Sequence, residues 1–175
     1  MVKNYFSFIF FLVTFSAFAQ SDSSIFDVAR TGTVAQMEVL LKKNPKVVNQ
    51  INDAGYSPLI LACYRGNTEV AVFLINNGAD LNYNNAMGTP LMAAVVKNNL
   101  EIVNLLLDKN VDVNQTDANG TTALIYAAMF KNHAIAKLLI QAKSNSETKD
   151  NRGNSALDYA ILADDDQLIE ILKTK

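Results

Sequence analysis

The chain has 175 residues, with 15 basic and 17 acidic side chains, one cysteine and one histidine. Half of the residues are apolar, which is enough to form a core and excludes a disordered chain. A net charge of −2 argues against nucleic-acid binding, because such binding needs a basic surface that neutralises phosphates. An internal disulfide and most metal sites need at least two cysteine or histidine residues, so we expect neither a disulfide, a metal ion nor a cofactor.

Residues 1–19 predict a secretory signal peptide. Lys3 provides a basic start, an almost unbroken apolar run covers residues 5–18, and the run ends in the sequence Ala-Phe-Ala at residues 17–19. The run is shorter than the roughly 20 apolar residues of a membrane-spanning helix. We therefore expect cleavage after Ala19, no stable membrane insertion afterwards, and export to the periplasm or secretion. An uncleaved membrane anchor is the alternative interpretation.

Residues 20–175 contain an internal repeat. A short motif recurs as SPLILA at residues 57–62, TPLMAA at 89–94, TALIYA at 122–127 and SALDYA at 155–160, with steps of 32, 33 and 33 residues. A second motif follows in register, as GADLN at residues 78–82, NVDVN at 110–114 and a degenerate KSNSE at 143–147. This pattern predicts stacked units, because one short unit cannot bury its apolar face alone.

The pattern resembles the ankyrin repeat, whose period is about 33 residues and whose signature includes Thr-Pro-Leu-His-x-Ala. The resemblance implies an all-α solenoid of stacked helix-turn-helix units joined by β-hairpin loops, with shortened units at both ends. About five units are expected in the domain formed by residues 20–175, at residues 24–51, 52–83, 84–116, 117–149 and 150–175. The histidine of the signature is replaced in this chain by Ile60, Met92, Ile125 and Asp158.

The residues of one unit have a physical explanation. Ser57 and its counterparts stand where a helix must begin and can cap its backbone N–H groups, and Pro58 suits the first turn. Gly66 is expected to end this helix in a left-handed turn, as is Asn98 one unit later, whereas Lys131 is less suited to that conformation. The loop at residues 84–88 is one residue shorter than the others. Met87 is predicted to take the place that a glycine holds in the other loops.

Catalysis is not expected. Cys63 stands at a small-residue packing position, and His133 lies two units further along the stack, so the two side chains cannot meet. The serine residues are helix caps or loop residues. The acidic run at residues 164–166 is interpreted as a helix cap, not as a cation site.

The family resemblance also implies a partner-binding groove, formed by the hairpin tips and the exposed ends of the first helices. Carried over to this chain, the helix-end positions are Arg30, Tyr64, Arg65, Val96, Lys97, Met129 and Phe130, and the tip positions include Tyr56, Met87 and Arg152. The first part of the predicted groove is basic and its far part is apolar. For Phe130, packing over the neighbouring unit is an equal alternative to binding.

We therefore expect a monomeric, non-catalytic module of the bacterial envelope or exported space that binds an unidentified protein partner and no nucleic acid. One alternative is a periplasmic immunity or inhibitor protein that blocks a toxin or an enzyme. A second alternative is a structural envelope protein held by an uncleaved signal helix.

Overall fold

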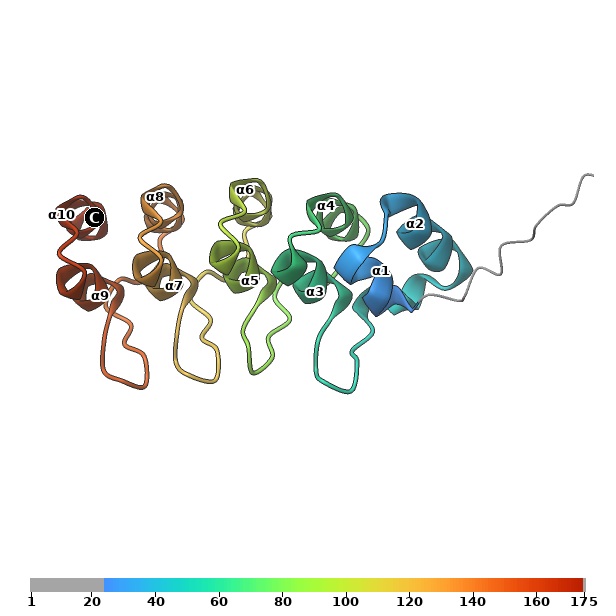
Figure 1. Ribbon diagram of the computed structural model, residues 1–175, viewed down its shortest axis with the longest axis horizontal. Coiled ribbons are helices and arrows are strands. Elements are labelled where there is room, and N and C mark those ends of the chain that lie inside the picture. Colours follow the sequence, from blue (N-terminus) through green and yellow to red (C-terminus); the bar gives the residue numbers. More distant parts are fainter. Residues whose placement is uncertain (1–23, 175) are drawn as a thin grey trace, which may run out of the picture.

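The computed structural model describes residues 24–174, so the predicted signal peptide lies outside the described residues. Ten α-helices and one short 3₁₀-helix form in these residues. They are α1 (Ile25–Thr31), α2 (Val34–Lys43), η1 (Pro45–Asn49), α3 (Pro58–Arg65), α4 (Thr68–Asn76), α5 (Pro90–Val96), α6 (Leu100–Asp108), α7 (Ala123–Met129), α8 (His133–Gln141), α9 (Ala156–Leu162) and α10 (Asp166–Lys173). Figure 1 shows successive helix pairs in a row, which confirms the predicted all-α solenoid.

The helices form two layers. The first helices α1, α3, α5, α7 and α9 pack side by side, and the second helices α2, α4, α6, α8 and α10 pack side by side behind them. The first helices lie between the second helices and the hairpin loops (Figure 1). The residues at the repeated apolar positions, such as Leu59, Leu91 and Leu124, are at most 1% exposed. The core is therefore one continuous layer between the two rows of helices, shared by all units.

Each first helix after α1 begins at the predicted hydroxyl cap. The side chains of Ser57, Thr89, Thr122 and Ser155 accept hydrogen bonds from the backbone N–H three residues later, at 3.2–3.3 Å. Pro58 and Pro90 occupy the first helical position, where no intrahelical N–H bond is lost. Asp165 caps α10 in the same way, with its carboxylate 3.0 Å from the Leu168 N–H. The interpretation of the acidic run as a helix cap is confirmed for this residue.

From the second unit on, the turn between the two helices of a unit is left-handed, as the sequence predicts, whereas Gly32 in the first unit has a φ of −84°. The φ angle is +73° at Gly66, +53° at Asn98 and +52° at Lys131. Lys131 therefore adopts the conformation for which it is poorly suited, and its Nζ donates a hydrogen bond to the carbonyl of Ala163 at 3.1 Å. Asp164 holds the corresponding place in the last unit with a φ of +51°.

The shorter hairpin differs from our prediction in one respect. Gly88, not Met87, takes the place of the glycine, because its N–H bonds to the carbonyl of Asn85 as the Gly55 N–H bonds to that of Asn52. The residue that this loop lacks, relative to the loop before α3, is the counterpart of Tyr56. Gly88 is therefore followed directly by Thr89, the cap of α5. Asn85 and Gly88 then form the antiparallel bridge that is the only one in residues 24–174. The hairpins of these residues contain no longer strand.

A ladder of asparagine side chains connects consecutive units on the hairpin side of the second helices. The Oδ1 atoms of Asn49, Asn82 and Asn114 accept hydrogen bonds from the backbone N–H of Asp80, Asp112 and Asn145, at 2.7–2.8 Å. Each acceptor therefore belongs to one unit and its donor to the next. The recurrent Asp-x-Asn sequence is explained by this ladder, since its asparagine reaches the following unit.

The first unit is more complete than the sequence suggests. Asn44 caps η1, with its Oδ1 accepting the N–H of Lys46 at 3.2 Å, and Pro45 begins that helix. Val48 of η1 is buried, and Asn49 begins the asparagine ladder. The segment after α2 therefore has a different turn in place of the Gly-Ala-Asp-Leu-Asn motif. This turn still provides a buried apolar residue and the asparagine that bonds to the next unit.

One buried hydroxyl group leads to a stability prediction. Ser144 stands where earlier units have Ala79 and Val111, and its Oγ is buried without a hydrogen-bond partner. Burial of an unsatisfied hydroxyl group costs free energy. Ser144→Ala is therefore expected to raise the free energy of unfolding by about 1 kcal/mol, measured by urea denaturation. A loss of stability in this variant would show that the hydroxyl group is hydrogen-bonded in solution.

Candidate functional site

The ten predicted partner-binding residues, here called the groove surface, lie at the ends of the first helices and in the hairpin loops. Four of them are large side chains with substantial exposure: Met87 (54% exposed), Phe130 (54%), Met129 (41%) and Tyr64 (40%). Arg65, Lys97 and Arg152 are also exposed, whereas Val96 is half-buried. The side of the molecule that carries the hairpins thus combines exposed apolar groups with exposed cations.

Two residues of the groove surface are also engaged in structural contacts. Arg30 is half-buried and its Nη1 lies 3.1 Å from the Asp27 carboxylate, one turn earlier in α1. Tyr56 is half-buried and packs against the core. Both residues are therefore less available to a partner than Arg65 or Phe130.

Tyr64 and Lys97 connect neighbouring units across the groove surface. The Nζ atom of Lys97, which follows α5, lies 5.0 Å from the ring centroid of Tyr64 at the end of α3. This distance is within the range of a cation–π interaction. The contact holds a positive charge over an exposed ring, so a single patch presents both a cation and an aromatic edge.

Phe130 contacts an aromatic residue of its own unit. Its ring stacks in parallel on Tyr126, one turn earlier, with the ring centroids 6.3 Å apart and the planes 7° from parallel. Phe130 remains 54% exposed in this position. This contact orients the ring and leaves more than half of the residue exposed, so both the binding and the packing interpretations stay predictions.

Sequence reasoning missed a pair of tyrosine–aspartate contacts behind this surface. The hydroxyl groups of Tyr126 and Tyr159 donate to the Oδ2 atoms of Asp117 and Asp150, each at 2.6 Å. Each aspartate Oδ1 accepts two backbone N–H groups of its own hairpin, at 2.8–3.0 Å. The earlier hairpins begin with asparagine instead, and their first helices have Leu61 or Ala93 in place of tyrosine. This correlation within the chain was the signal that could have predicted the pairs.

One member of each pair has a shifted pKa, namely Tyr126 and Asp150. Burial is the main reason that the pKa of Tyr126 is raised to about 12, and the nearby Asp117 carboxylate adds to this effect. The Tyr159 hydroxyl group lowers the pKa of Asp150, and the backbone N–H groups of Asn154 and Arg152 lower it further. The Tyr126 phenol therefore stays protonated and the Asp150 carboxylate stays charged at neutral pH, as donor and acceptor of fixed hydrogen bonds.

A hollow of about 220 Å³ lies between the last two hairpins. It is lined by Tyr126, Tyr159 and Met129, and by polar residues of the two hairpins that include Asp150 and Arg152. The volume is that of one side chain. Met129 and Arg152, two residues of the predicted groove, are thus brought together with the tyrosines at one indentation of the surface.

Two exposed apolar side chains at the end of the stack were also missed. Ile161 and Leu162 are 55% and 73% exposed. Leu162 holds the helix-end place of Tyr64 and Met129 and extends the apolar part of the groove surface. Ile161 corresponds to Cys63 and Ala128, which are each 1% exposed because a following unit covers them.

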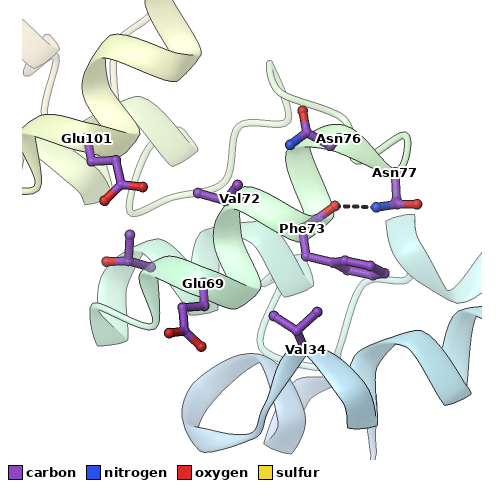
Figure 2. A pocket seen from close by; sticks show the side chains of 8 residues that line it. Val34, Glu69, Val72, Phe73, Asn76, Asn77 and Glu101 are labelled. Carbon is purple, nitrogen blue, oxygen red and sulfur yellow. Dashed lines mark hydrogen bonds between the residues drawn. The ribbon is translucent and has the colours of Figure 1, made fainter.

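A further hollow, of about 750 Å³, lies on the other side of the molecule, among the second helices. Figure 2 shows Val34 and the Phe73 ring next to each other, with Glu69 and Glu101 on neighbouring helices. Both glutamates stand in the first turn of their helices, α4 and α6, where the helix dipole favours a carboxylate. The Asn77 side chain donates to the Phe73 carbonyl at 2.7 Å and closes the end of α4. Each of these polar groups has a role in its own helix.

The residues considered for catalysis lie apart. Cys63 is buried in α3, and burial raises the pKa of its thiol to about 12, so it is not a thiolate at neutral pH. The Nε2 atom of His133 lies 2.9 Å from both oxygens of Asp165, the cap of α10. No group of three or more histidine, cysteine or acidic residues in residues 24–174 is arranged to hold a metal ion. No helix within this range is long and apolar enough to span a membrane.

Comparison with known families agrees with the repeat pattern. A family model described as "Ankyrin repeats (3 copies)" matches residues 25–117 and again residues 109–175. The two matches together cover the whole stack of helices. A search of curated proteins found no significant match.

The Tyr126–Asp117 pair predicts a change of stability in alkaline solution. The pKa of Tyr126 is about 12 in the folded protein, compared with 10.0 for an ordinary tyrosine. Its contribution to the free energy of unfolding is therefore complete below pH 10 and is lost as the pH rises towards 12. Tyr126→Phe should remove this part of the pH dependence, measured by urea denaturation between about pH 9 and pH 11. An unchanged alkaline dependence in the variant would contradict the assignment.

Proposed function

We propose that this chain, which belongs to the ankyrin-repeat family, is an exported binding module that captures a protein partner on its groove surface and has no catalytic activity. Ankyrin repeats serve as protein–protein interaction modules, and solenoids of this kind bind along an extended surface. The observation that best supports binding on the groove surface is Phe130, a large aromatic side chain that is 54% exposed and stacks on Tyr126.

The composition of the surface supports the same proposal. Interfaces concentrate their binding energy in aromatic, methionine and arginine side chains near the centre of the contact. These types are supplied at the end of α3 by Tyr64 and Arg65, and two units further along, at the end of α7, by Met129 and Phe130. Leu162 extends them at the end of α9. Singly exposed apolar residues need no explanation, but a row of them beside cations is typical of a binding surface.

The rigidity of the surface supports binding without large rearrangement. Lys97 is placed by Tyr64, Phe130 by Tyr126, and the hairpins by the bonds of Asp117 and Asp150. Side chains that are already fixed lose less conformational entropy when a partner binds. We infer that the groove surface is held in its binding conformation before the partner arrives.

The absence of catalysis is part of the proposal. A nucleophile needs a base within hydrogen-bond reach, and the buried Cys63 and the Asp165-bound His133 belong to different units. The tyrosine and aspartate groups near the surface are occupied by each other and by backbone N–H groups.

Removal of two groove side chains should abolish partner capture. Burial of a large aromatic side chain stabilises a contact by about 1.5–3 kcal/mol, so Phe130→Ala with Arg65→Ala is expected to weaken binding at least about tenfold. The measurement is affinity capture from a periplasmic extract, followed by titration of the captured protein. The helical content and the melting temperature of the variant should remain close to those of the unchanged protein, since both side chains are exposed.

A matched control is available on the other layer. Val39 in α2 is 58% exposed and Lys46 in η1 is exposed, and neither belongs to the groove surface. Val39→Ala with Lys46→Ala removes an apolar and a basic side chain from the second-helix side and should leave capture unchanged. Equal loss of binding in both double variants would contradict a role for the groove surface.

Export predicts a specific processed mass. Cleavage after Ala19 would leave residues 20–175, so mass spectrometry of the protein isolated from the exported fraction should give a chain that begins at Gln20. The basic start, apolar run and Ala-x-Ala sequence of residues 1–19 support this expectation. A full-length mass in the membrane fraction would instead favour the anchored envelope protein.

A further inference from the structure

We infer that the groove surface recognises an acidic protein segment that carries an aromatic or large apolar side chain. This inference deepens the proposed function and rests on it. It concerns the chemistry of the partner, which is set by the charges that the groove surface presents and by the nearby carboxylates whose oxygens are already hydrogen-bonded.

The groove surface has the opposite charge to the chain as a whole. The whole chain has a net charge of −2, yet Arg65, Lys97 and Arg152 are exposed on this surface. None of the three forms an ion pair within residues 24–174, whereas Arg30 at the edge of the surface is paired with Asp27. A surface that concentrates cations attracts an acidic partner and repels a basic one.

The carboxylates near these cations are occupied by other groups. Asp117 and Asp150 are buried, and each accepts two backbone N–H groups and one phenol O–H. Arg152 contributes to the low pKa of Asp150, but its side chain forms no hydrogen bond with that carboxylate among the described contacts. Asp53 on the first hairpin is the exposed carboxylate of the tips, so the cations outnumber the available anions on this surface.

The apolar requirement comes from the far part of the surface. The hollow of about 220 Å³ is lined by Tyr126, Tyr159 and Met129 together with polar residues, which include Arg152 and the hydrogen-bonded Asp150. Phe130 presents an open ring face beside it, and Leu162 continues the apolar strip. A side chain of the partner that enters the hollow would contact tyrosine rings and Met129, and a carboxylate beside it would lie within reach of Arg152.

The basic and apolar parts follow each other along the stack. Arg65 and Lys97 belong to the units of α3 and α5, and Met129, Phe130 and Leu162 belong to those of α7 and α9. The Tyr64–Lys97 contact keeps the Lys97 ammonium group over a ring instead of over a carboxylate. A partner segment laid along these units meets Arg65 and Lys97 first and the apolar groups afterwards, with Arg152 beside the apolar groups. Its acidic residues should therefore lie both before and beside its apolar residue.

A peptide selection tests the inference even while the natural partner is unidentified. A random library of displayed peptides is selected on the purified protein, and the enriched peptides are synthesised and titrated by fluorescence polarisation. The enriched sequences should be acidic and contain an aromatic or large apolar residue. Their affinity should fall as the salt concentration rises, because screening weakens contacts between exposed charges.

Charge-reversal variants then separate the two levels of the proposal. The triple variant Arg65→Glu, Lys97→Glu and Arg152→Glu should weaken binding of the enriched peptides more than tenfold. The matched variant Lys46→Glu, Lys109→Glu and Lys137→Glu has the same change of net charge on exposed positions outside the groove surface, and it should bind as the unchanged protein does. Both variants are checked for folding by circular dichroism.

Each other outcome overturns a definite statement. Enriched peptides that are neutral or basic, or that bind equally to the groove triple variant, would contradict recognition of an acidic segment. If Phe130→Ala still abolishes binding of such peptides, the groove surface would remain the binding site. Binding unaffected by either Phe130→Ala or the groove triple variant would overturn the proposed function as well. A selection that enriches no peptide would overturn recognition of a linear acidic segment.

Discussion

The structure depends on one constraint: no unit of this chain can bury its apolar face without a neighbour. A pair of helices of seven to ten residues leaves one side of the core exposed, and only the next pair covers it. The constraint is visible at the end of the stack, where Ile161 is exposed although Cys63 and Ala128, its counterparts, are almost fully covered. It also explains why the connections between units are as regular as the helices, since each loop must place the next unit in register.

Apolar burial holds the units together, and hydrogen bonds between units fix their relative positions. The asparagine ladder joins consecutive hairpin bases, and Asn67 donates to the carbonyl of Gly32 at 2.9 Å from one unit to the previous one. Such bonds are directional, so they fix the position of each hairpin relative to the next, whereas apolar contacts alone would tolerate sliding. The backbone of the surface formed by the hairpins and helix ends is therefore fixed in position as well. Its exposed side chains are therefore free to vary in chemistry without loss of the scaffold.

The fold was predictable from the sequence because it depends on residues that recur in register. The caps, the helix-opening prolines and the left-handed turn at Gly66 each follow from a local rule. The loop at Asn85 was assigned incorrectly, since a missing residue shifts the alignment by one and only the hydrogen bonds show which glycine serves the turn. The Tyr126–Asp117 pair depends on which side chains meet across nine positions, and no local rule of sequence specifies that contact.

The candidate site combines hydrogen-bonded carboxylates with exposed cations, and this combination favours a role in binding a partner protein. The aspartates of the last two hairpins accept hydrogen bonds from tyrosines and backbone N–H groups, so their carboxylate oxygens are already occupied. The cations Arg65, Lys97 and Arg152 form no ion pair within residues 24–174. Folding stability alone gives no reason to keep three exposed cations on one side beside exposed aromatic rings, because unpaired surface charges contribute little to stability. An acidic partner supplies that reason, since its carboxylates would complete the contacts that the fold leaves open.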